Sequence, residues 1–138
     1  FYTAYRIHNY HFAIYGAMFL GQYEPALAAA EALVETTPED LIRVPSPPMA
    51  DFIESYISMK QHVYIRFGKW HEIIAEPLPD DRDLYLVTTA TIHYAKGVAH
   101  AALGQVAEAE AEKALFLIAR ARVPETTLLH NNPPLIHI

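Results

Sequence analysis

LGQYEPA, residues 20–26, joins two apolar segments of the chain through a single glycine, Gly21. The same arrangement returns in FGKW, residues 67–70, and in LGQV, residues 103–106. Each time a long segment ends at the glycine, and an apolar or aromatic residue two positions later opens the next segment. A tight turn between antiparallel helices needs a residue that tolerates a positive φ, which glycine does without a steric penalty. The repeated turn therefore predicts a series of helical hairpins.

The segments on either side of these turns have the periodicity of α-helices. Apolar residues recur at spacings of three and four, and no stretch shows sustained alternation of apolar and polar residues. We expect hairpins at residues 5–37, 49–76 and 83–122, in one repeat domain spanning residues 1–125. The last stretch, residues 126–138, contains NNPP and is interpreted as a tail or linker toward a further C-terminal part.

The second hairpin is expected to be irregular. Its first helix should cover residues 49–67, whereas Pro77 and Pro79 cut its second helix short soon after Trp70. The acidic residues 80–83 favour the start of the next helix, because carboxylates are stabilising at a helix N-terminus. We therefore expect an irregular surface around Pro77 and Pro79, and a partner site there that a regular repeat would lack.

The first hairpin resembles the tetratricopeptide repeat family, whose second helix carries the pattern Gly-x-Tyr-x-x-Ala and ends at proline. The matching residues are Gly21, Tyr23, Ala26 and Pro38. In the third hairpin Gly97, Gly104 and Ala109 match, but Val106 replaces the aromatic residue. In the second hairpin Trp70 fits, but Ile73 replaces the alanine. The glycine turns are irregularly spaced, and only the second interval approaches the family's period of about 34 residues.

This resemblance implies an all-α fold: a right-handed α-solenoid of about three antiparallel helical hairpins, in which the first helices line a concave face. HNYHF, residues 8–12, is also similar to a segment of bacterial repeat proteins of unknown activity. The chain begins with Phe1 rather than methionine. We therefore interpret it as a fragment of a larger bacterial-type repeat protein.

Such a concave face suits an extended peptide or a partner helix, so the resemblance implies a protein-interaction scaffold. Chaperone-type acidic tails are not expected as ligands, because the face lacks the paired Lys and Asn residues with which some family members clamp a carboxylate. The open ends of such a stack expose apolar edges, which favours self-association. The residues expected on the concave face are His8, His11, Tyr15, Met18, Phe19, Ser58, His62, Ile65, Arg66 and Tyr94.

The composition of the chain argues against several other classes of function. A formal net charge of −6 argues against nucleic-acid binding, and no apolar run approaches the roughly 20 residues that span a bilayer. The absence of cysteine excludes disulfides, thiolate metal sites and a cysteine nucleophile, and fits a reducing compartment. We expect a cytoplasmic protein, with the periplasm left open because a signal could precede Phe1.

Histidine is the unusual residue of this chain, with 8 in 138 residues. His8 and His11 share a helix face, and His62 falls on the equivalent face of the next hairpin. These three are the alternative hypothesis, a module that binds a metal or a small ligand. In contrast, His93 and His100 are expected to be satisfied inside the third hairpin.

No catalytic residue is predicted. The chain contains no His-Glu-x-x-His, no Gly-x-Ser-x-Gly and no glycine-rich phosphate loop. We therefore expect no cofactor and no enzymatic activity, unless a larger parent chain uses the histidines in a metal-dependent reaction.

Overall fold

The computed structural model describes residues 2–130, and within this range it contains helices and no strand. The predicted all-α class is confirmed. The helices are α1 (Tyr2–Phe19), α2 (Tyr23–Glu35), α3 (Glu39–Ile42), α4 (Met49–Ile53), the 3-10 helix η1 (Glu54–Ser58), α5 (Met59–Arg66), α6 (Trp70–Ala75), α7 (Leu86–Ala102) and α8 (Val106–Arg120). None of the described helices is both long enough and apolar enough to cross a membrane.

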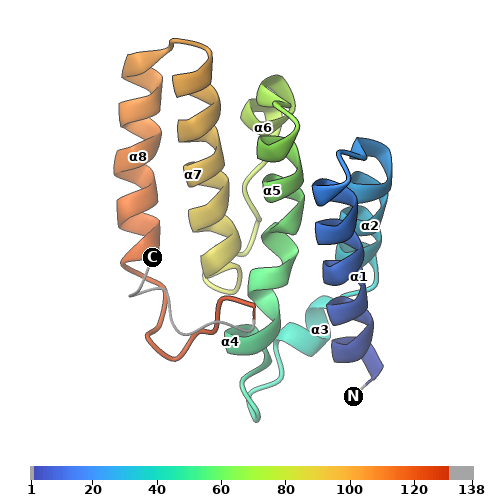
Figure 1. Cartoon of the computed structure of the whole chain (residues 1–138). Helices are drawn as coiled ribbons and strands as arrows, with labels where there is room; N and C mark the ends of the chain where they lie inside the picture. The colour runs from blue at the N-terminus through green and yellow to red at the C-terminus, as the bar shows by residue number, and fades with distance from the viewer. Residues whose placement is uncertain (1, 131–138) are drawn as a thin grey trace.

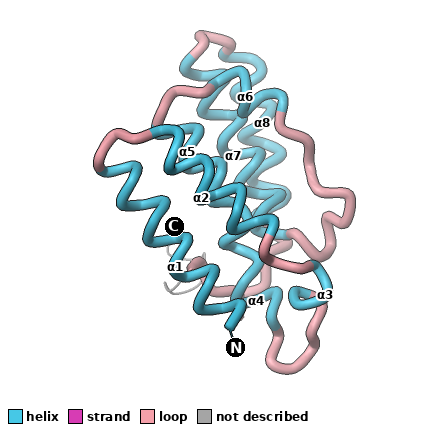
Figure 2. The backbone as a smooth tube through the Cα atoms, turned by 90° about the vertical axis from the view of Figure 1, so that its right-hand side faces the viewer, coloured by secondary structure: helices cyan, strands magenta, loops and turns pink. Residues whose placement is uncertain are grey.

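The helices form three antiparallel pairs that stand side by side (Figure 1). The central pair is α5 with the short α6; α5 packs against α1 and α2 on one side and against α7 on the other. The third pair is α7 with α8 (Figure 1). Figure 2 shows that α1 and α2 lie one behind the other in the view of Figure 1, so the molecule has two layers. The three helix pairs span residues 2–35, 49–75 and 86–120.

The three glycine turns have the same backbone geometry. The φ angles are 69° at Gly21, 66° at Gly68 and 74° at Gly104, a region that L-amino acids with a Cβ rarely adopt. In each turn the N–H after the glycine donates to the carbonyl oxygen five residues earlier, at 2.9 Å. This hydrogen bond satisfies a carbonyl that the end of the helix would otherwise leave free. Glycine is thus required by the turn itself.

Most of the core lies between the first and second pairs. Its fully buried side chains are Ile7, Ile14, Leu33, Ile53, Met59 and Val63. A smaller cluster joins α6 to α7 through Ile73, Ala95 and Ala99, with Trp70 packed against it. By contrast α8 buries only Ala119, because it packs on α7 and leaves its other sides open.

A buried carboxylate sets the start of α7. Glu54 of η1 is 2% exposed, and its two oxygens accept the backbone N–H groups of Val87, at 3.0 Å, and Thr88, at 2.7 Å. These N–H groups belong to the first turn of α7, where no intrahelical partner exists and where a negative charge is favoured. The predicted role of residues 80–83 as the helix start is wrong, because Asp81 caps only the local turn at Asp83 and Leu84.

Burial of Glu54 disfavours its ionised form. Loss of solvation raises the pKa of Glu54 to about 7 from its ordinary 4.5, although hydrogen bonds from Thr88 and Val87 oppose the rise. The folded protein therefore binds a proton here more tightly than the unfolded chain does. This contribution to stability is fully present below about pH 4.5 and is lost as the pH rises toward 7.

Two glycines of α1 and its turn provide a matched test of the turn geometry. A Cβ at Gly16 or at Gly21 would meet no atom within 4 Å, but only Gly21 has a positive φ. Gly21→Ala should lower the free energy of unfolding by about 1–2 kcal/mol. Gly16→Ala should raise it by up to about 1 kcal/mol, since alanine is the better helix former. Urea denaturation measures both, and equal effects would contradict the requirement for glycine in the turn.

Glu54→Gln tests the buried carboxylate. In the wild type, the rise of this pKa from 4.5 to about 7 corresponds to roughly 3 kcal/mol of unfolding free energy, lost between these pH values. The glutamine of Glu54→Gln does not titrate. The free energy of unfolding of the wild type should therefore fall relative to that of the variant as the pH rises. Glu35→Gln, at an exposed side chain of α2, is the control. If the difference in unfolding free energy between wild type and variant did not change with pH, the pKa of Glu54 would not be raised by burial.

Candidate functional site

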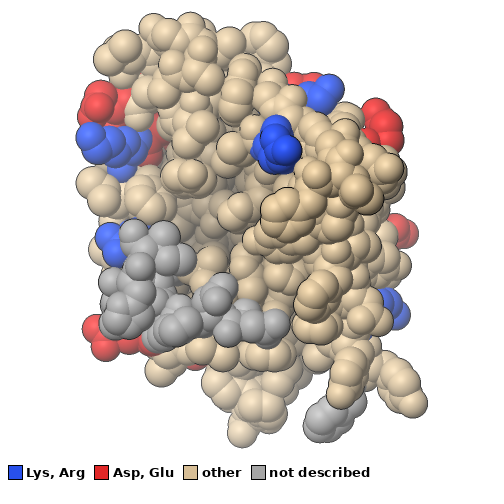
Figure 3. Space-filling view, in the orientation of Figure 1, with Lys and Arg blue, Asp and Glu red and all other residues tan. Residues whose placement is uncertain are grey.

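The predicted histidines of α1 and α5 lie near one another, and we call the surface that they share the concave face. His11 and His62 come from α1 and α5 and are close enough to influence each other's charge. His11 also contacts the ring of Tyr15, with 4.8 Å between centroids. Figure 3 shows a hollow on this face, with charged side chains mainly at its margins. The structure therefore brings His11, Tyr15 and His62 together.

The chain's own C-terminal segment lies on this face. After α8 the chain turns back below α7 and reaches α4 and η1 (Figure 1). There Thr126 Oγ1 donates to the carboxylate of Asp51 at 2.7 Å, and the N–H of Leu128 donates to the Asp51 carbonyl at 2.8 Å. The N–H of His130 donates to Ser55 Oγ at 2.9 Å. We call residues 126–130 the C-terminal strap.

The prediction of a tail or linker is therefore wrong for residues 126–130, which pack against the second hairpin. Thr127 and His130 are buried, and the strap's hydrogen bonds run to α4 and η1. The rest of the predicted linker, residues 131–138 with the NNPP stretch and His137, lies outside the described residues.

His130 enters a slot made of rings. It stacks on His11, with centroids 4.8 Å apart and planes 28° apart, and meets the edges of Tyr56 at 5.0 Å and His62 at 6.1 Å. We call His11, Tyr56 and His62 the ring slot. His130 itself is 6% exposed. Sequence reasoning could not place it, since the strap has no periodicity and its partners are far away in the chain.

The slot holds its imidazoles in the neutral form. Burial, and next the neighbouring His11 and His62, lower the pKa of His130 to about 4. The pKa of His11 is lowered by burial and by His8 and His62, and that of His62 by burial. The Nε2 atoms of His11 and His130 are buried and make no hydrogen bond within residues 2–130. The slot is thus suited to uncharged rings and unsuited to a cation.

The structure gives no support to a metal ion at His8, His11 and His62. Within residues 2–130 no three His, Asp or Glu side chains are grouped so that they could hold a metal. His8 packs its ring on Phe12, at 4.7 Å, and His11 stacks face to face with His130. Stacked rings direct their nitrogen lone pairs side by side rather than toward one point, so this arrangement does not chelate.

Several residues expected on the concave surface are not available there. Met18 belongs to the main core, and Ile65 packs against the smaller cluster around Ile73. Ser58 is buried in η1, where its hydroxyl donates to the Ser55 carbonyl at 2.8 Å. For Met18 and Ser58 the prediction of partner contact is wrong, because spacing along a helix does not reveal which stripe the neighbouring helices cover.

Three other predicted residues remain accessible. Phe19 is 82% exposed at the end of α1, and Arg66 is exposed at the end of α5, where it lies over the ring of Phe67. Tyr94 of α7 is 45% exposed and packs one side against Phe116. These residues form the part of the predicted surface that the strap does not use.

The histidines of the third hairpin are structural. His93 is buried and its Nδ1 is hydrogen-bonded to Glu112 Oε2 of α8 at 2.7 Å, as expected for a satisfied core histidine. His100 is half-buried beside the turn, and its Nδ1 lies 2.6 Å from Gln105 Oε1, so it also has a partner. Neither residue is poised to act on a ligand.

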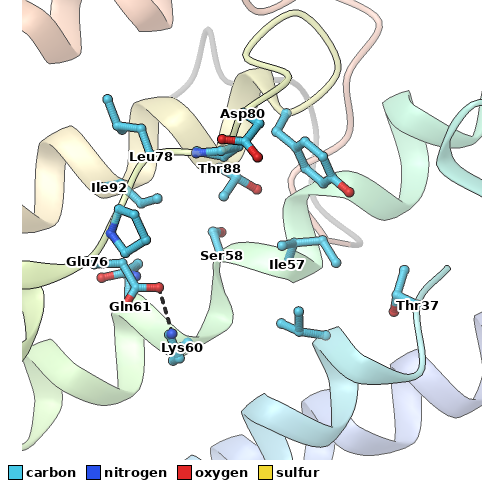
Figure 4. A pocket seen from close by; sticks show the side chains of 14 residues that line it. Thr37, Ile57, Ser58, Lys60, Gln61, Glu76, Leu78, Asp80, Thr88 and Ile92 are labelled. Carbon is cyan, nitrogen blue, oxygen red and sulfur yellow. Dashed lines mark ion pairs between the residues drawn. The ribbon is translucent and has the colours of Figure 1, made fainter. Parts of the chain in front are cut away.

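A second candidate site lies where the second hairpin is irregular (Figure 4). Because α6 ends at Ala75, the chain from Glu76 to Asp80 runs without a helix and leaves a cavity of about 390 Å³. Lys60 and Glu76 form an ion pair of 2.6 Å at its side. The buried Gln61, which also lines it, has an amide oxygen without a partner in the described chain. The expected irregular surface is therefore present, and this cavity shares no residue with the ring slot.

The two outer helices expose apolar side chains. On α1 these are Tyr5, Phe12 and Phe19, spaced seven residues apart and therefore on one stripe. On α8 they include Leu117 and Ile118. Exposed apolar stripes at both ends of a helical stack are what an additional helix would cover.

Comparison of this chain with protein-family models, with curated proteins and with solved structures found no match.

The histidine slot predicts that acid releases the strap. The pKa of His130 is 6.5 when exposed and about 4 when docked, so docking is fully stable above about pH 6.5 and is weakened as the pH falls toward 4. Hydrogen-exchange protection of the Leu128 and His130 amides should therefore fall by tenfold or more between about pH 7 and pH 5. Amides in the middle of α7 are the internal control, and equal loss in both places would contradict local release.

Proposed function

We propose that this chain is a protein-interaction scaffold, a right-handed α-solenoid of tetratricopeptide type whose concave face binds an extended segment of a partner protein. The observation that carries the proposal is the strap. Its residues 126–130 lie against α4 and η1 with two main-chain hydrogen bonds, to the Asp51 carbonyl and to Ser55 Oγ. A surface that already accommodates one short non-helical segment has acceptors for the backbone of another.

The repeated hairpin geometry supports the scaffold. Three turns with the same positive-φ glycine and the same hydrogen bond bring three helix pairs side by side. Since the turns are short, each pair is held antiparallel, and a shallow face remains between the first and third pairs (Figure 3). Stacked helical pairs of this kind present extended binding surfaces in other repeat proteins.

The predicted residues of the concave face that stay exposed indicate the chemistry of the partner. Phe19 and Tyr94 offer rings, and Arg66 offers one cation. Aromatic residues and arginine are the residue types enriched at protein interfaces. We therefore propose a partner segment that is mainly apolar or aromatic rather than a highly charged one.

A binding role also accounts for the conspicuous titratable groups better than catalysis does. Glu54 is occupied as the cap of α7, and His93 is occupied by Glu112. The imidazoles of the ring slot are packed against other rings. No described carboxylate or histidine of these sets faces an open cavity together with a nucleophile, so we propose no reaction.

A peptide-display selection on the full chain, followed by NMR titration of a selected peptide, tests the proposal. The peptide should perturb amides of α1, η1 and α5 on the concave face. Tyr94→Ala should weaken binding by about tenfold, the size of effect expected for an aromatic interface residue. Val106→Ala, at an exposed apolar residue of α8, is the matched control and should have no effect. Perturbations confined to the cavity between α5 and α7 would contradict the proposal.

A further inference from the structure

We infer that the concave face recognises a short non-helical segment in which a hydroxyl-bearing residue is followed, four positions later, by an uncharged ring. The strap, with Thr126 and His130, is the resident example. This inference rests on the proposed function and specifies the partner of the same site. The contacts of the strap fall into three groups. We call the contact of Thr126 with Asp51 the hydroxyl end, the two bonds of the strap's backbone N–H groups the main-chain hold, and the contacts of the His130 ring the ring end.

Asp51 provides the hydroxyl end. Its carboxylate accepts hydrogen bonds from Thr126 Oγ1 at 2.7 Å and from Thr127 Oγ1 at 3.4 Å. A carboxylate acts only as an acceptor, so it selects a side chain that donates. A serine or threonine satisfies this requirement, whereas a carboxylate at the same position of a partner would be repelled by like charge.

The main-chain hold fixes the register. The carbonyl of Asp51 accepts the N–H of Leu128 at 2.8 Å, and Ser55 Oγ accepts the N–H of His130 at 2.9 Å. Asp51 and Ser55 are four residues apart on consecutive helical turns. These bonds do not depend on the partner's side chains, so they place a segment that adopts the backbone of the strap, including the φ of 56° at its last residue, with its hydroxyl at Asp51 and its later side chain in the ring slot.

The ring end selects shape and excludes positive charge. His11 offers its face, and Tyr56 and His62 offer their edges, to the inserted ring. Within residues 2–130, the titratable groups around the slot are His8 and His11 of α1, Tyr56 of η1 and His62 of α5, and the carboxylate that contacts the strap, Asp51, lies at the hydroxyl end. A lysine or arginine in the slot would be desolvated without an opposite charge, which is costly. A phenylalanine or a neutral histidine would fill it.

The strap is therefore a competitor of the partner. Because it is tethered to α8, its effective concentration at the groove is on the order of millimolar, and a partner segment must displace it or bind when it is released. This explains how one surface can carry both an internal contact and a binding function.

The rule can be tested on the strap itself, in the chain of 138 residues. His130 has a φ of 56°, so His130→Phe and His130→Lys carry the same backbone penalty and differ in ring and charge. Hydrogen exchange should show that His130→Phe keeps the protection of the Leu128 amide within about threefold of wild type, whereas His130→Lys and Thr126→Val each lower it by about tenfold or more. His71→Lys, at an exposed residue of α6, is the control for added charge. Equal protection in the Phe and Lys variants would overturn the inference.

A second measurement tests the same rule on separate peptides that bind to the chain. Synthetic peptides of residues 121–130, ending in His, Phe or Lys, are titrated into the His130→Lys chain, whose own strap is released. The His and Phe peptides should bind at least tenfold more tightly than the Lys peptide, and replacing the threonine at position 126 by valine should weaken both. Equal binding of all peptides would overturn the recognition rule while leaving the scaffold function standing. Failure of these peptides alongside binding of peptides from the display selection would also overturn only the rule. If neither set binds the concave face, both proposals fail.

Discussion

The carboxylate of Glu54 on the first turn of α7 is the contact on which the arrangement of this protein depends. The residue before α7, Tyr85, offers no side-chain cap, and the preceding segment contains Pro77 and Pro79. Without Glu54 the N–H groups of Val87 and Thr88 would be buried with no partner, which costs stability. The bond also crosses between hairpins, so it sets where the third pair stands relative to the second.

The same 3-10 helix also holds the strap. Ser55 and Tyr56 follow Glu54 directly, and they hold the backbone and the ring of His130. Ser58, at the end of η1, lines the cavity beside Pro77 instead. A 3-10 helix has three residues per turn, so successive side chains point in widely separated directions and five residues serve three different surfaces. The break in the expected helix at residues 49–67 therefore lets one short segment contact α7, the strap and the cavity.

Two buried groups give the molecule opposing responses to acid. Glu54, with its pKa raised to about 7, stabilises the junction with α7 most strongly at low pH. His130, with its pKa lowered to about 4, stabilises the docked strap most strongly at high pH. Both shifts arise first from burial, but loss of solvation neutralises an acid by protonation and a base by deprotonation. Mild acid should thus open the concave face while the helical body remains intact.

The sequence by itself determined the helical hairpins, because their signals are local: Gly21, Gly68 and Gly104 in turns, prolines after helix ends, and a spacing of three and four between. It also indicated His11 and His62 on one face, and an irregular second hairpin near Pro77. Only the tertiary structure decided that Glu54 caps α7, that His130 fills the ring slot, and that Met18 and Ser58 are covered. The physical reason is that these outcomes depend on contacts between residues far apart in the chain. Such contacts follow from how whole helices pack, and the pattern within any one helix does not record them.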